Sequence, residues 1–230
     1  MGDPGGTEPR FPGYDVLAQA RQWDDVTRGV VLARLAPHAG ASFFAAAEEA
    51  TARALMDRLL AQDAEPRVPV FEMVDQRLAS GVGDGYRFED MPEDGEAWRA
   101  SLARLEEEAE ERRGLPFHAL QVRDQMAVID DLQRLGKQRW RGLRADHLLE
   151  LWLRYCCEAF YSHPAAWNEI GFGGPAYPRG YVSLGFDHRE RWEVAEHDAL
   201  DPVPWGERAE AARRRHEAAG AGDGDAGGAA

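Results

Sequence analysis

Apolar residues recur at spacings of three and four through the middle of this chain, and this spacing places side chains on one face of a helix. Glycine or proline separates the successive apolar stretches. Ser42 stands where the first stretch begins and is expected to cap it, while Gly81, Gly114 and Gly136 are expected to end the next three. The helices predicted by this pattern cover about residues 42–62, 70–80, 92–113, 117–135 and 144–162.

The stretch from residue 144 to 162 is apolar on most sides, which is typical of a helix at the centre of a core. His163-Pro164 is expected to end it. Residues 167–181 are rich in glycine, proline and aromatic residues, and we expect a rigid loop there rather than a helix. No stretch alternates with period two for long enough to predict a sheet. The expected fold is all-α: a single compact helical domain with a Gly/Pro/aromatic-rich C-terminal cap loop and flexible termini.

The chain divides into three expected regions. Residues 1–41 form an N-terminal arm that is expected to be partly disordered, and within it residues 14–35 are compatible with a short helix or an extended segment. Residues 42–205 are expected to form the helical domain. Residues 206–230 are predicted to be a charged helix followed by a low-complexity tail.

The charge of the chain narrows the classes of partner. There are 27 Lys and Arg residues against 41 Asp and Glu residues, which gives a formal net charge of −14. This balance argues against a nucleic-acid partner and against docking on an anionic membrane surface. The first residues are polar, so we expect no signal peptide and no membrane insertion. A cytoplasmic chain and a chain exported together with a partner both stay open.

The sequence motifs give little evidence for a catalytic, cofactor or metal site. Residues 171–176 fit Gly-x-Gly-x-x-Ala, but a dinucleotide fingerprint needs a preceding strand and a following helix. None of the seven histidines stands in His-Glu-x-x-His or Glu-x-x-His. Cys156 and Cys157 are adjacent and are expected to be reduced core thiols. The acidic run Glu106–Glu111 is expected to be a solvated helix face, with a site for a basic partner as the alternative.

The segment from Trp167 to Tyr181 is the most distinctive feature of the sequence. Glycine allows close backbone approach, while proline and aromatic residues stiffen the path and supply rigid apolar area. Trp, Tyr and Arg are also enriched at interface hot spots. Internal packing and a preformed docking surface therefore both stay open, and both can hold for different side chains. The candidate interface residues are Trp167, Asn168, Glu169, Phe172, Gly173, Gly174, Pro175, Tyr177, Pro178, Arg179 and Tyr181.

Residues 160–181, with the run Trp-Asn-x-Ile-Gly-x-Gly-Gly-Pro, resemble the signature block of the gluconate 2-dehydrogenase subunit 3 family. A weaker likeness upstream extends the coverage to about residues 42–185. The resemblance implies a non-catalytic small subunit that binds and stabilises, as a folding or export aid, a large FAD-dependent sugar or sugar-acid dehydrogenase of the glucose-methanol-choline type. It implies FAD in the partner, no cofactor in this chain, and in several such complexes a cytochrome c subunit.

The family has no catalytic residues to transfer to this chain. Family members often begin with a twin-arginine export signal, and the start of this sequence does not show one. Two alternative functions remain open: a stand-alone small helical enzyme, and a cofactor carrier that holds metal or haem through the cysteine pair or a histidine.

Overall fold

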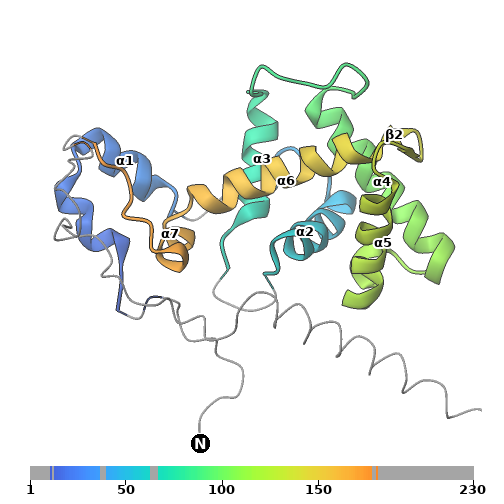
Figure 1. Ribbon diagram of the computed structural model, residues 1–230, viewed down its shortest axis with the longest axis horizontal. Helices are drawn as coiled ribbons and strands as arrows, with labels where there is room; N and C mark the ends of the chain where they lie inside the picture. Colours follow the sequence, from blue (N-terminus) through green and yellow to red (C-terminus); the bar gives the residue numbers. More distant parts are fainter. Residues whose placement is uncertain (1–10, 12, 37–39, 63–66, 178–179, 181–230) are drawn as a thin grey trace, which may run out of the picture.

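The computed structural model describes residues 11, 13–36, 40–62, 67–177 and 180. Within them every regular element is a helix apart from one two-stranded hairpin, so the predicted all-α fold is confirmed (Figure 1). The elements in chain order are the 3₁₀ helix η1 (Val16–Gln22), α1 (Asp25–Ala33), α2 (Ala46–Leu60), α3 (Val70–Ser80), α4 (Asp94–Arg113), the 3₁₀ helix η2 (Phe117–Ala119), α5 (Val122–Leu135), β1 (Arg139–Trp140), β2 (Leu143–Arg144), α6 (Ala145–Ser162) and α7 (Pro164–Ile170).

Helix α6 lies at the centre of the fold, as its apolar composition predicted. It packs against α2, α3, α4, α5 and α7. Its Trp152 is fully buried, as is Trp98 of α4. The Ser101 hydroxyl links them, because its Oγ accepts the Trp152 Nε1–H at 3.0 Å and donates to the Trp98 backbone carbonyl at 2.8 Å. Each large apolar side chain buried in this way stabilises the fold by about 1.5–3 kcal/mol.

Helix α2 begins at Ala46 and not at Ser42, so the predicted cap is wrong. The buried carboxylate of Asp75 on α3 accepts the backbone N–H groups of Ser42, Phe43 and Phe44 at 2.6, 3.0 and 2.9 Å. These bonds hold the backbone of residues 42–44 on α3, outside any helix. The helix starts after them, where the Ala45 N–H donates to Glu48 Oε2 at 2.7 Å.

The predicted glycine stops are confirmed. Gly81 and Gly114 both adopt left-handed backbone angles, with φ of +66° and +67°, as expected for residues that follow a helix. Gly136 follows α5 with φ of +51°. Helix α4 begins at Asp94, two residues beyond Pro92, because Glu93 still has an extended ψ of 145°.

The hairpin was missed in the sequence. Its strands are two residues long and pair Arg139 with Arg144 and Trp140 with Leu143. Arg141 and Gly142 form the turn with φ of +48° and +91°, the pair of positive angles that suits a two-residue hairpin. Strands this short contain no alternation to recognise.

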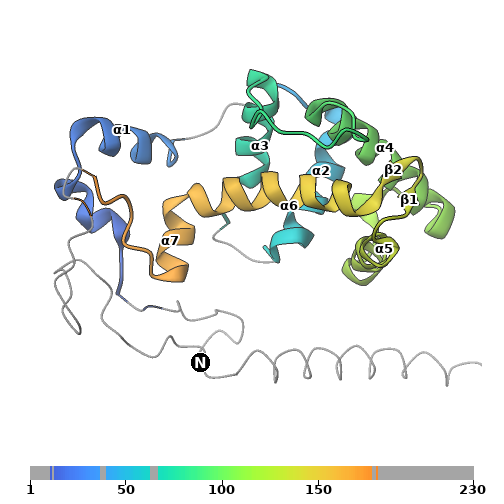
Figure 2. The ribbon, with the colours of Figure 1, turned by 45° about the horizontal axis from the view of Figure 1, so that its top comes forward.

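The N-terminal residues form a second, smaller core at the far end of α6 from α4 and α5 (Figures 1 and 2). Residues 14–36 contain η1 and α1 rather than one extended segment. Val16, Trp23 and Val31 are at most 3% exposed and cluster with Trp167 of α7. The name N-terminal arm, predicted over residues 1–41, is used from here on for residues 13–36, which contain η1 and α1.

One residue, His163, is both the C-cap of α6 and the N-cap of α7. His163 ends α6, as predicted, and also caps α7, because its Nδ1 accepts the Ala165 N–H at 3.2 Å. Pro164 occupies the first turn, where its missing N–H costs nothing. The expectation of a loop from Trp167 onward is therefore wrong for Trp167–Ile170, which lies in α7.

Candidate functional site

Residues 167–177, the described part of the distinctive segment, are held by the N-terminal arm through hydrogen bonds between side chains and backbone. The Val16 N–H donates to Asn168 Oδ1 at 2.8 Å, and the Tyr14 hydroxyl donates to the Phe172 carbonyl at 3.0 Å. Val16 is fully buried, so its N–H would lack a hydrogen-bond partner without the Asn168 amide. Asn168 therefore has an internal structural role.

Two glycines of the segment lie against aromatic side chains. Gly174 has φ of +73°, and a Cβ atom there would lie 2.9 Å from Trp23 Cζ2 and 3.0 Å from Val16 Cγ2. Gly171 has φ of +67°, and a Cβ atom there would lie 2.8 Å from the Phe11 ring. These distances are too short for any side chain, so glycine at both positions is explained by packing within this chain.

Trp167 also faces inward. It is 5% exposed, and its Nε1–H donates to the Tyr161 carbonyl at 2.7 Å. The Arg34 guanidinium lies 5.8 Å from the centre of the Trp167 ring and donates to the Ser162 carbonyl at 2.6 Å. Arg34 thus ties the end of α1 to the junction of α6 and α7.

Other side chains of the same segment face solvent. Ile170 is 45% exposed, Phe172 38% and Tyr177 63%, and we call these three residues the outward set. Glu169 is exposed as well. Phe172 meets Trp167 edge to face at 5.6 Å, so an exposed ring stands on a buried one. The candidate interface thus separates into anchors and exposed residues.

The remaining residues of the predicted interface are either intermediate in exposure or lie outside the described residues. Gly173 and Pro175 are half-buried. Pro178, Arg179 and Tyr181 lie outside the described residues, as do the predicted charged helix and tail at 206–230.

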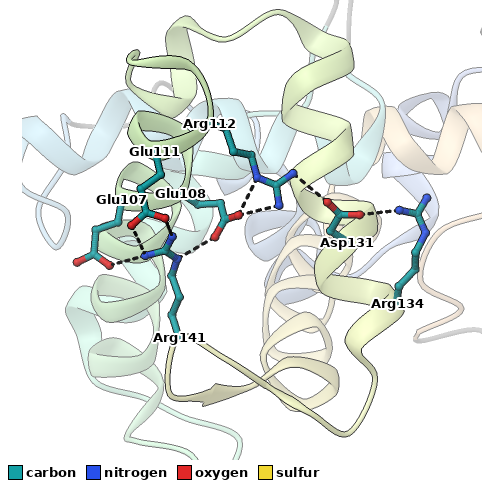
Figure 3. Close-up of polar contacts among 7 residues, drawn as sticks. All are labelled: Glu107, Glu108, Glu111, Arg112, Asp131, Arg134 and Arg141. Atoms are coloured by element: carbon teal, nitrogen blue, oxygen red, sulfur yellow. Dashed lines mark hydrogen bonds and ion pairs between the residues drawn. The ribbon is translucent and has the colours of Figure 1, made fainter.

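The acidic run on α4 contacts a residue of the same chain (Figure 3). Arg141, at the hairpin turn, donates to Glu108 at 2.8 Å, to Glu107 at 3.3 Å and to Glu111. The Arg141 carbonyl in turn accepts Nε–H of Arg104 at 2.5 Å. The run therefore fixes the hairpin onto α4 while Glu107 and Glu111 keep about two thirds of their side chains in solvent.

The same network extends to α5. Arg112 joins Glu108 at 2.7 Å to Asp131 at 2.9 Å, and Asp131 accepts from Arg134 at 2.6 Å (Figure 3). Burial alone would raise the pKa of Glu108, but hydrogen bonds from Arg141 and Arg112 outweigh it and lower that pKa. The carboxylate is thereby kept ionised and structural.

A cavity of about 730 Å³ opens between the loop that follows α3, the start of α4 and α6. Two of the carboxylates that line it are ion-paired: Asp84 accepts from Arg77 and from Arg154, and Arg154 also contacts Asp94 at 3.1 Å. The Tyr155 hydroxyl donates to Asp94 at 2.7 Å, and burial together with this bond raises its pKa. Tyr155 is thus kept protonated, and this arrangement favours a closed ion-pair cluster over a general base.

The remaining candidate groups for catalysis or metal binding are a histidine paired with a carboxylate and two free thiols. His147 Nδ1 lies 2.7 Å from Asp90, and the Phe88 ring stacks on the imidazole at 3.5 Å. Cys156 is buried and Cys157 half-buried, both are free thiols, and burial raises the pKa of each. In the described ranges no three His, Cys, Asp or Glu side chains gather as metal ligands, and no helix is long and apolar enough to cross a membrane.

Comparison with known families gives one match. The family model described as gluconate 2-dehydrogenase subunit 3 matches residues 46–174. Neither the curated proteins nor the solved structures gave a match to this chain. The matched range covers α2 to α7 and ends at Gly174, the glycine that packs on Trp23, so the N-terminal arm lies outside it.

Proposed function

Because this chain belongs to the gluconate 2-dehydrogenase subunit 3 family, we propose that it is a non-catalytic subunit that binds and stabilises a large dehydrogenase subunit. The partner is an FAD-dependent sugar or sugar-acid dehydrogenase of the glucose-methanol-choline type. It carries the FAD and the substrate site, and a cytochrome c subunit of the same complex takes its electrons. The small subunit assists the folding or export of this partner.

The observation that carries the proposal is the division of the distinctive segment into anchors and an outward set. Asn168, Gly174 and Trp167 fix the backbone against the N-terminal arm. Phe172 and Tyr177 then stand in solvent on a backbone that is already ordered. A docking surface ordered before binding avoids part of the entropy cost of association, and aromatic side chains supply large contact area.

Binding of this kind stabilises a partner by mass action. A protein that binds the folded partner but not its unfolded chain adds about 2.7 kcal/mol to the partner's stability when it is present at 100 times the dissociation constant. No catalytic group is required for this effect. The closed ion-pair cluster around Tyr155 is compatible with such a structural role.

The test is co-expression of the full chain with the large flavoprotein subunit of its own complex, followed by capture through a tag on the small chain. We expect a yellow complex with dye-linked sugar oxidation, and loss of soluble flavoprotein when the small chain is omitted. Flavoprotein that folds and works equally well alone and never co-purifies would refute the proposal. Turnover of sugar acids by the purified small chain without flavoprotein would establish the enzyme alternative instead.

Variants of the outward set make the test specific. Ile170→Asp and Tyr177→Asp, at the two most exposed residues of the outward set, are expected to weaken capture of the flavoprotein while leaving the thermal unfolding of the small chain unchanged. Tyr86→Asp is the matched control, because Tyr86 is 56% exposed on the loop that follows α3. Equal loss of capture in all three variants would show a nonspecific effect of added charge.

A further inference from the structure

Helix α6 carries an apolar row on its solvent side. Leu149, Leu153, Cys157 and Tyr161 follow one another at four-residue spacing, beginning beside α5 and ending at the junction with α7. Leu153 is 36% exposed and Tyr161 51%, while Leu149 and Cys157 are half-buried. We call these four residues the α6 row. It lies on a different face from the buried Leu148, Trp152 and Tyr155 of the same helix.

A groove of about 620 Å³ runs beside the first three residues of the row. Gln133 of α5 contributes one wall, and Leu149, Leu153 and Cys157 of α6 contribute the apolar part of the other. The groove is thus bounded by two packed helices and not by loops. Its shape does not depend on the ordering of a flexible segment.

The spacing of the row indicates what fits against it. Side chains at i and i+4 form a ridge on a helix, and such ridges pack into the grooves of a second helix. Leu149 and Tyr161 are twelve positions apart on α6, and at about 1.5 Å per residue the row is about 18 Å long. That length matches roughly three turns of a partner helix.

Charge points to the chemistry of that helix. Glu150 borders the groove, is exposed, and has no ion pair with any residue in the described part of the chain. Arg154, the only guanidinium that lines the groove within the described residues, is already bound by Asp84 and Asp94. A basic residue on the incoming helix would therefore find an unused carboxylate. A second copy of this chain would instead bring another net charge of −14.

We infer that the α6 row and its groove bind an amphipathic helix of the large dehydrogenase subunit, with a basic side chain of that helix facing Glu150. The inference rests on the proposed function and adds a second contact to it. The row ends at Tyr161, whose carbonyl accepts the Trp167 indole N–H, so it runs directly up to the segment that carries the outward set.

Cys157 provides a reporter within the row, since Cys156 beside it is fully buried. The rate of maleimide modification of Cys157 is measured in the full chain alone and in the purified complex, with Cys157→Ala as the blank. We expect at least a tenfold slower reaction in the complex. An unchanged rate in an intact complex overturns the inference and leaves the proposed function standing. If the rate in the chain alone decreases as the concentration of the chain increases, a second copy occupies the groove, and this result also overturns the inference.

Leu153→Asp is the matching variant, with Val82→Asp as the control, because Val82 is 68% exposed and does not line this groove. Leu153→Asp is expected to weaken flavoprotein binding at least tenfold at an unchanged midpoint of thermal unfolding, and Val82→Asp to leave binding intact. Equal binding by both variants contradicts the α6 contact alone. Failure of the unmodified chain to bind the flavoprotein at all contradicts both proposals together.

Discussion

The backbone N–H of Val16 donates to Oδ1 of Asn168 across 152 positions of sequence. One side chain thereby joins η1 to α7 and connects the N-terminal arm to the family's signature segment. Because Val16 is fully buried, water cannot replace this acceptor. The order of the segment consequently depends on residues outside the range that the family model matches.

Asn168→Ala is expected to lower the free energy of unfolding by about 1–3 kcal/mol, since it leaves the Val16 N–H without a partner. Glu169→Ala, one position along and exposed, is expected to change it by less than about 0.5 kcal/mol. Urea unfolding of the two variants measures the difference. Equal values would show that the bond contributes nothing to the attachment of the arm.

Gly174→Ala and Gly173→Ala differ in a way that tests the packing of the arm. A Cβ at Gly174 meets Trp23 and Val16 at 3.0 Å or less and would also carry a positive φ, whereas a Cβ at Gly173 meets nothing within 4 Å. We expect the first substitution to cost about 2 kcal/mol or more and the second to be neutral. Hydrogen exchange should show faster opening of the arm amides in Gly174→Ala alone.

The helices could be predicted because their evidence is local. Apolar periodicity lies within each predicted helix, glycine directly follows α3, α4 and α5, and the composition of α6 predicts its central position. The start of α2 could not be predicted, because the carboxylate of Asp75 that decides it stands 33 positions after Ser42. The hairpin at Arg141 was too short to show a pattern.

The candidate site could be located from the sequence, but its buried anchors could not be told apart from its exposed residues. Its glycine and aromatic content singled out the segment, yet no local signal distinguishes Trp167, which faces Val16 and Trp23, from Tyr177, which faces solvent. That distinction comes from contacts with the N-terminal arm some 150 residues earlier. The α6 row was missed because Leu153 and Cys157 read as further core residues of an apolar helix.

Asp75→Ala is expected to destabilise the chain by about 3 kcal/mol or more, because three backbone N–H groups lose a charged acceptor in a buried position. Ser42→Ala is expected to be nearly neutral, since its hydroxyl caps no helix. Asp75→Asn keeps one acceptor oxygen and should fall between them. Denaturant unfolding measures the loss of unfolding free energy in the three variants. A loss in Ser42→Ala equal to that in Asp75→Ala would support the Ser42 cap predicted from sequence.

Arg141 combines ion pairing with an unfavourable backbone angle. Its φ of +48° costs a residue with a Cβ about 1–2 kcal/mol, which glycine avoids. Arg141→Ala and Arg141→Gly both remove the contacts with Glu107, Glu108 and Glu111. We expect the glycine variant to be the more stable of the two by about 1 kcal/mol in thermal or urea unfolding. The reverse order would mean that the turn relaxes when the guanidinium is removed.

The contribution of Arg141 should also depend on pH. The pKa of Glu108 is lowered below its ordinary value of 4.5 in the folded chain, so its stabilising effect is complete above that pH and is lost as the pH falls through the folded pKa. The difference in unfolding free energy between the unmodified chain and Arg141→Ala should therefore shrink below about pH 4.5. Arg139→Ala, which removes only a bond to the Gly142 carbonyl, should show a difference that stays constant with pH. Unfolding measured from pH 7 to pH 3 decides between these outcomes, because a constant gap for Arg141→Ala would mean that its ion pairs with the acidic run contribute no stability.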